Sequence, residues 1–222
     1  MVTAPGDEES MSVFDTYAEG LGQEGILITG RDLTISAEEE IDAWDSRTET
    51  DPAMQDRLTA YWSNVGVTDW TPSGTPWSAA FVSYLLRRHG FKGSSAHWEF
   101  TRDIIAGSSD YPGWKAYNLP FNIYGSGVEL NVGDVLVRKR SGSNTAGHSD
   151  VVYRVDPQAG YAYVVGGNLS DTVASRRVEL LEGRRMGSSD YQIILKKQGG
   201  GTKKNSLLWL LAAGGLAWIF LK

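Results

Sequence analysis

Five short β-rich runs follow one another in the second half of the chain, between residues 128 and 197. They are VGDVLVRKR, HSDVVYRVD, YAYVVGGN, ASRRVELL and YQIILKK. Turn-forming Gly, Pro, Asn and Ser residues separate them, and connections this short join antiparallel strands, whereas parallel strands need a long crossover. The sequence therefore predicts an antiparallel sheet of about five strands in this half of the chain.

Helical patterns fill the part of the chain before these strands. Ser36 and Glu39 have the spacing of a capping box, which predicts a short helix from residue 37 to about residue 44. An Asp-Pro pair at residues 51–52 is a second start signal, and the apolar residues after it recur at helical spacing until Gly66.

A third helix is expected within TPWSAAFVSYLLRRHG, residues 75 to 90. Thr75 followed by proline is the start signal, the apolar residues after it form one stripe, and Gly90 ends the helix. Because helices come first and strands afterwards, the sequence predicts an α+β domain whose helices pack on one face of the antiparallel sheet.

The charge and the cysteine content exclude several classes of function. The chain has 27 acidic and 21 basic residues, a formal net charge of -6, which disfavours a nucleic-acid partner held by a broad basic face. The absence of cysteine excludes disulfides, thiolate metal ligands and a thiol nucleophile. The three histidines lack the paired spacing of a zinc site, and no phosphate loop or dinucleotide motif is present. We therefore expect no metal and no cofactor.

The C-terminus has the composition of a membrane anchor. Residues 198–205 are a glycine-rich linker, and residues 206–221 form an uncharged, mostly apolar run. As a helix this run is roughly 24 Å long against about 30 Å of bilayer hydrocarbon, so bilayer thinning or lysine snorkelling has to cover the difference. A helix that is apolar on all faces must be buried, which favours a single-pass transmembrane helix over a terminal helix docked on the domain.

The topology of such an anchor stays open. The acidic N-terminus lacks the features of a secretory signal. Lysines at residues 203–204 favour a cytoplasmic domain by the positive-inside rule, and Lys222 beyond the run weakens that bias.

Ser78 is the candidate nucleophile. If Thr75 caps the helix, Ser78 lies in the first turn, where free backbone N–H groups and the positive end of the helix dipole stabilise developing negative charge. A hydroxyl there suits acyl transfer, with backbone amides as oxyanion donors. Serine is also common in first turns because its side chain bonds the backbone, so an ordinary structural serine is the alternative.

His148 is the favoured general base for Ser78. It opens a predicted strand after a Gly- and Ser-rich loop, and strand alternation puts His148 and Asp150 on one face. Asn168, at the end of the next predicted strand, has a side chain able to accept the imidazole N–H and hold its tautomer. Asp150 competes for that role. A lone surface histidine and a turn-forming asparagine explain the same spacing equally well.

The other two histidines are assigned lesser roles. His89 lies about 16 Å from Ser78 along the same helix, so we expect it to interact with the C-terminal end of the helix dipole. His97, within SSAHWEF, is expected to line the substrate groove together with Trp77. A structural histidine that caps the following helix is the alternative for His97.

Five segments taken together resemble a bacterial domain family of unknown function that carries a PWSAAF signature. They are PWSAAFVSYLLRRHG, SSAHWEF, VGDVLVRK, GHSDVVYRV and VVGGN, in the order and approximate spacing of the family. That family is similar to the CHAP amidohydrolases and peptidases, which have a papain-like fold. Their cysteine lies at a helix N-terminus, their histidine in the following strand region and a polar orienting residue beyond it. The resemblance covers roughly residues 55 to 185.

The resemblance implies roles for particular residues. Ser78 stands at the nucleophile position, where a CHAP domain has cysteine, His148 at the base, and Asn168 or Asp150 at the orienter. The implied reaction is hydrolysis of an amide or peptide bond of peptidoglycan through an acyl-enzyme. A serine hydroxyl is far less acidic than a thiol and depends more on its base, so a catalytically inactive CHAP-like module for wall or peptide binding, or for particle assembly, is the alternative.

The predicted organisation has four parts. They are an acidic helical extension at residues 1–50, a CHAP-like domain at residues 51–197, the linker at residues 198–205 and the anchor at residues 206–221. The expected partners are peptidoglycan or a peptide, and a cell or virion membrane. The missing secretory signal and the terminal apolar run together favour a phage or another injected particle as the source of such a protein.

Overall fold

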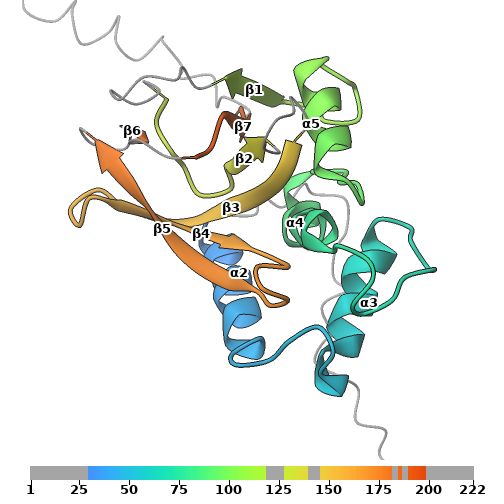
Figure 1. Ribbon diagram of the computed structural model, residues 1–222. Coiled ribbons are helices and arrows are strands. Elements are labelled where there is room, and N and C mark those ends of the chain that lie inside the picture. The colour runs from blue at the N-terminus through green and yellow to red at the C-terminus, as the bar shows by residue number, and fades with distance from the viewer. Residues whose placement is uncertain (1–29, 119–127, 140–145, 182–184, 187–189, 199–222) are drawn as a thin grey trace, which may run out of the picture.

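The computed structural model describes residues 30–118, 128–139, 146–181, 185–186 and 190–198 (Figure 1). Helices come first along the chain and pack against the sheet that the later strands build (Figure 1). The helical elements are α2 (Gly30–Ala43), η1 (Pro52–Met54), α3 (Gln55–Asn64), α4 (Ser78–Leu86), η2 (Arg87–His89) and α5 (His97–Ile105). The predicted α+β class with an antiparallel sheet is confirmed.

The sheet has seven strands in the order β1-β7-β2-β3-β4-β5-β6, and all neighbours are antiparallel. They are β1 (Trp114–Asn118), β2 (Val135–Lys139), β3 (Ala146–Asp156), β4 (Tyr161–Gly166), β5 (Ala174–Leu181), β6 (Arg185–Met186) and β7 (Ile193–Lys197). The five predicted runs correspond to β2, β3, β4, β5 and β7. The expected count of about five is too low, because β1 and β6 carry little apolar alternation and form through pairing with β7 and β5.

The sheet buries side chains on both of its faces. Along β2, Val135 and Val137 belong to the core under the helices, whereas Leu136 between them belongs to a second apolar cluster on the opposite face. Helices α2, α4 and α5 contact β3 on the helical face. Because β3 lies in the middle of the sheet, its residues are held by strands on both sides and by helices above.

Helix α2 begins at Gly30, earlier than the residue 37 that the sequence predicts. Ser36 therefore lies inside the helix and does not cap it. Leu33 and Ala37 pack in the helical-face core, and the Thr34 hydroxyl donates to the backbone oxygen of Tyr153 at 2.6 Å. Tertiary packing thus extends the helix beyond its local start signal. Residues 30–50 share one core with the rest of the domain, so no structural boundary lies at residue 50.

Of the next two predicted helix starts, the structure confirms the first and moves the second. The Asp51 side chain accepts from the backbone N–H of Ala53 at 2.9 Å, and Gly66 follows α3 with φ 73°, which confirms the second predicted helix. Helix α4 begins only at Ser78, and Thr75 does not cap it. The Thr75 hydroxyl instead accepts from the backbone N–H of Thr71 at 3.3 Å.

The predicted linker, residues 198–205, lies outside the described residues apart from its first residue, and the predicted anchor, residues 206–221, lies wholly outside them, as do residues 1–29. Among the helices that are described, none is both long and apolar enough to cross a membrane.

Candidate active site

Ser78 is the first residue of α4, and its hydroxyl meets a histidine. Its Oγ lies 2.7 Å from Nε2 of His97, the first residue of α5. The residue is 8 % exposed, so this hydrogen bond is shielded from water. The N-terminal ends of α4 and α5 are therefore brought together at the candidate nucleophile.

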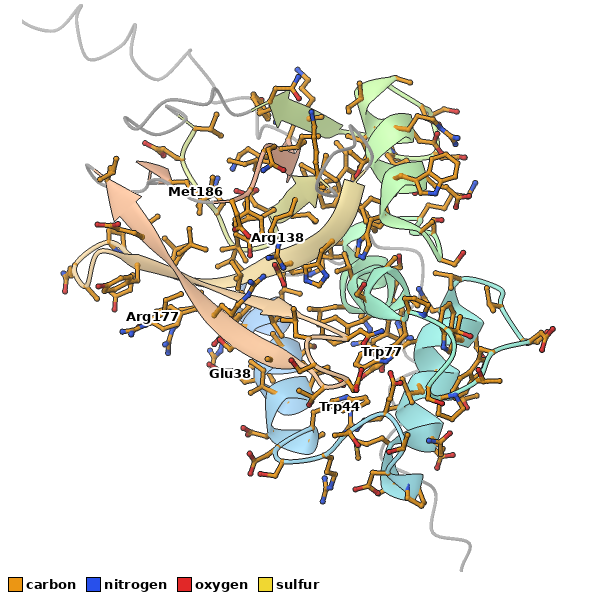
Figure 2. All side chains as sticks on the ribbon, in the orientation of Figure 1. Glu38, Trp44, Trp77, Arg138, Arg177 and Met186 are labelled. Atoms are coloured by element: carbon orange, nitrogen blue, oxygen red, sulfur yellow. The ribbon has the colours of Figure 1, made fainter. Side chains whose placement is uncertain are left out.

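The tryptophan before Ser78 anchors α4 in the core and does not line a groove. Trp77 is 1 % exposed, stacks on Trp44 with ring centres 4.8 Å apart, and donates from Nε1 to the buried Glu49 carboxylate at 2.7 Å (Figure 2). The sequence places Trp77 in a substrate groove, and the structure contradicts this because an aromatic cluster covers the whole ring.

His97 is buried as well, and its environment keeps it neutral. Only 7 % of the residue is exposed, so it too lies below the surface instead of in an open groove. Burial lowers the pKa of His97 to about 3, with the charge of His148 acting in the same direction and the charge of Asp150 opposing it. Its Nδ1 atom is buried and has no hydrogen-bond partner among the described residues. At neutral pH this imidazole is therefore unprotonated, and the same burial disfavours the imidazolium that would form if it accepted a proton.

A second histidine lies behind the first. His148, near the start of β3, packs against His97 with ring centres 5.6 Å apart. Its Nε2 lies 3.0 Å from Oδ1 of Asp150, so the two side chains share one face of β3, as strand alternation predicts. The sequence favours His148 as the direct partner of Ser78, whereas the structure places His97 there, because α5 brings its first side chain to the start of α4.

Asp150 is a buried charge with three donors around it. It is 0 % exposed, and its Oδ2 accepts from Arg176 and from the hydroxyl of Tyr191 while Oδ1 faces His148. Burial alone raises the pKa of Asp150, but the hydrogen bond and charge of His148, the charge of Arg176 and the hydrogen bond from Tyr191 together lower it. The carboxylate therefore stays ionised at neutral pH.

Asn168 does not occupy the orienting position. It follows β4 in a turn with φ 55°, a left-handed conformation that asparagine tolerates. Its side chain shares no hydrogen bond with His148, although both residues are described, and Asp150 is bonded to that imidazole instead. Of the two candidates that the sequence leaves open, the structure brings Asp150 to the histidine.

Two glycines, the last residue of β4 and the one after it, allow the backbone to pack closely against the site. A Cβ on Gly166 would collide with Oδ1 of Asp150 and lie 3.1 Å from Nε2 of His148. A Cβ on Gly167 would lie 2.7 Å from atoms of Trp77 and Phe81. The glycine pair of VVGGN is therefore required by close approach of the backbone to the site.

Gly166→Ala should destabilise the protein by about 1–3 kcal/mol, because the new methyl group displaces the Asp150 carboxylate from His148. Urea unfolding measures the change. Gly30→Ala is the control, since a Cβ there makes an ordinary contact at 3.4 Å with Val132. Equal stability of the two variants would contradict this tight approach.

Sequence reasoning did not identify Arg176 and Tyr191. They come from β5 and from the segment before β7, and no spacing signal connects them to Asp150. Within the described ranges, no group of three or more His, Asp or Glu side chains is arranged to hold a metal ion.

No protein-family model matches the chain, and no curated protein or solved structure matches it significantly. What the site does must therefore be argued from its own geometry.

Proposed function

We propose that the protein is a hydrolase that cleaves an amide or peptide bond through an acyl-enzyme on Ser78. The observation that carries the proposal is the 2.7 Å contact between Ser78 Oγ and Nε2 of a buried, neutral histidine. A nucleophile within hydrogen-bond reach of a base, with a further group acting on that base, is the arrangement of nucleophilic catalysis. Here the further group is the His148–Asp150 pair.

In the proposed reaction His97 is the general base and then the general acid. The Ser78 hydroxyl donates to Nε2 in the tautomer that carries the ring proton on Nδ1, and Ser78 Oγ attacks the carbonyl carbon as the hydroxyl proton moves to Nε2. The imidazolium then gives the proton to the leaving amine as the C–N bond breaks and the acyl group stays on Ser78. A water molecule attacks this ester, giving a proton to His97, which returns it to Ser78 Oγ as the carboxylic acid product leaves. Asp150 stabilises this imidazolium, since its negative charge opposes the lowering of the His97 pKa.

The start of α4 supplies backbone hydrogen-bond donors for the oxyanion. The first backbone N–H groups of a helix lack intrahelical acceptors, and the dipole makes this end positive. Ser78 is the first residue of α4, so these groups lie next to the attacking oxygen. Stabilisation of a tetrahedral intermediate by such donors is the largest single contribution in many acyl-transfer enzymes.

Peptidoglycan is the proposed substrate class, and a papain-like, CHAP-like domain is the proposed relationship. The support is the resemblance of the sequence motifs, together with a nucleophile at a helix N-terminus. The base departs from the CHAP pattern, because His97 on α5 contacts Ser78, and the strand histidine His148 lies next to His97 and is bonded to Asp150. We further propose, from the sequence alone, that residues 206–221 anchor the protein in a cell or virion membrane. Membrane fractionation of chains with and without these residues tests the anchor.

One observation favours a second candidate function, a non-catalytic module that binds wall or peptide. Nδ1 of His97 is buried without an acceptor among the described residues, whereas the base of a hydrolytic triad normally has that nitrogen held. Ser78→Cys separates the two functions. A thiol beside His97 should raise turnover if the geometry is catalytic and change nothing if the protein only binds.

Turnover of purified peptidoglycan, followed as release of new amino groups, tests the hydrolase. His97→Gln should lower kcat/KM about 10³-fold, because the proton of Ser78 then has no base. His89→Gln is the matched control, since His89 lies at the other end of the same helical stretch, beyond α4, and should leave turnover unchanged. Equal activity of the two variants would remove His97 from the reaction.

A further inference from the structure

The carboxylate of Asp150 is held from the side opposite the histidines. Asp150 lies on β3, Arg176 on β5 and Tyr191 just before β7, and the three meet on the sheet face that carries the second apolar cluster. Arg176 and Tyr191 both donate to Oδ2, and the Tyr191 hydroxyl also accepts from Arg176 at 3.0 Å. Oδ1 is thereby left for His148.

We propose that Tyr191 and Arg176 are positioning residues for the proposed reaction, which hold the buried Asp150 carboxylate as an anion with Oδ1 turned to His148. This inference rests on the hydrolase proposed above. A carboxylate with both donors on one oxygen has only one orientation that satisfies them, so the other oxygen is fixed as well. The two residues act on His97 only through Asp150 and touch no substrate.

Two features of the surroundings indicate why Asp150 needs this clamp, which is formed by Arg176 and Tyr191. Asp150 is 0 % exposed, and a buried carboxylate without partners would take up a proton and lose the charge that His97 depends on. Arg176 and Tyr191 also line a surface hollow of about 570 Å³, so the clamp borders solvent.

Several other ionisable groups lie near Asp150 or its two donors and must be kept constant in a test. His148 on β3 and His97 on α5 interact with Asp150, Arg138 on β2 interacts with Tyr191, and Asp190 before β7 interacts with Arg176. Changing only Tyr191 leaves all four in place. Tyr191→Phe removes one hydroxyl from a buried ring, so it is also the variant most certain to fold.

Tyr191→Phe should lower kcat about tenfold with KM unchanged and move the acid limb of the pH–rate profile to higher pH. The ¹³Cγ signal of Asp150 should also titrate at higher pH, because a donor to its charged form is gone. Tyr153→Phe is the matched control. It removes a buried tyrosine hydroxyl, bonded to Ser175 at 2.9 Å, from the other face of the sheet.

Substitutions of Arg176 provide a second test. Arg176→Lys keeps a positive charge and should retain more of kcat than Arg176→Gln. The carboxyl titration requires no turnover, so an inactive protein would remove the hydrolase while the titration still decides the role of the clamp. The proposal is overturned if folded Tyr191→Phe titrates at Asp150 as the native protein does and the pH–rate profile, where there is turnover, does not move.

Discussion

Ser78→Ala should abolish hydrolysis, with a loss in kcat of roughly 10⁴ to 10⁶-fold, because no other hydroxyl among the described residues is bonded to Nε2 of His97. The residual rate comes from the oxyanion donors and substrate binding. The substitution also leaves Nε2 of a buried imidazole without its partner, which costs about 1–3 kcal/mol of folding free energy. Peptidoglycan turnover and urea unfolding measure the two effects separately.

Ser83→Ala is the matched control for this loss. Ser83 lies one turn further along α4, is 0 % exposed, and bonds to backbone atoms of Ala79 and Ser94. Its removal should cost stability of the same order and leave kcat nearly unchanged, since it touches neither histidine. Turnover that survives in Ser78→Ala, or falls equally in both variants, would show that Ser78 is not the nucleophile.

The fold could be predicted from the sequence wherever the local pattern and the packing agree. Helices before strands gave the α+β class, and the Asp51 cap gave the start of the second predicted helix. The start of α2 could not be predicted from the capping-box signal at Ser36. Burial of Leu33 in the core under the helices favours a helix that begins earlier in the chain. Strand β6 could not be predicted either, since a strand of two residues is too short to show an alternation of apolar and polar residues.

The site, like the fold, could be predicted from the sequence only in part. Strand alternation correctly put His148 and Asp150 on one face, because that relation is local to β3. The partner of Ser78 depends on how α5 crosses α4, and no spacing between residues 78 and 97 encodes that approach. One signal was available in the sequence: the chain has only three histidines, so each of them is a candidate base for Ser78.

Asp150→Asn should be the most destabilising change in the site. It removes the buried anion to which Arg176 and Tyr191 donate. Because the Arg176 side chain is 36 % exposed, its charge stays partly solvated, and the cost is that of the lost hydrogen bonds to a charged group, about 1.5–3 kcal/mol each. The amide nitrogen of asparagine can only donate, so it cannot replace Oδ1 as the acceptor when His148 carries a proton on Nε2. Urea unfolding at pH 7 measures the loss, and turnover should fall with it because the imidazolium of His97 loses its counter-charge.

The pH dependence separates this electrostatic effect from a packing defect. Because the pKa of Asp150 is lowered by folding, its contribution is fully present above the unfolded value of about 3.9 and is lost as the pH falls through the folded value. The gap between native protein and Asp150→Asn should therefore be constant above pH about 4 and narrow only below it. Asp190→Asn is the control, because its ion pair with Arg138 is exposed and is worth at most about 1 kcal/mol. A gap that persists unchanged into acid would mean that the Asp150 side chain stabilises by packing, and that its charge is not what holds the site together.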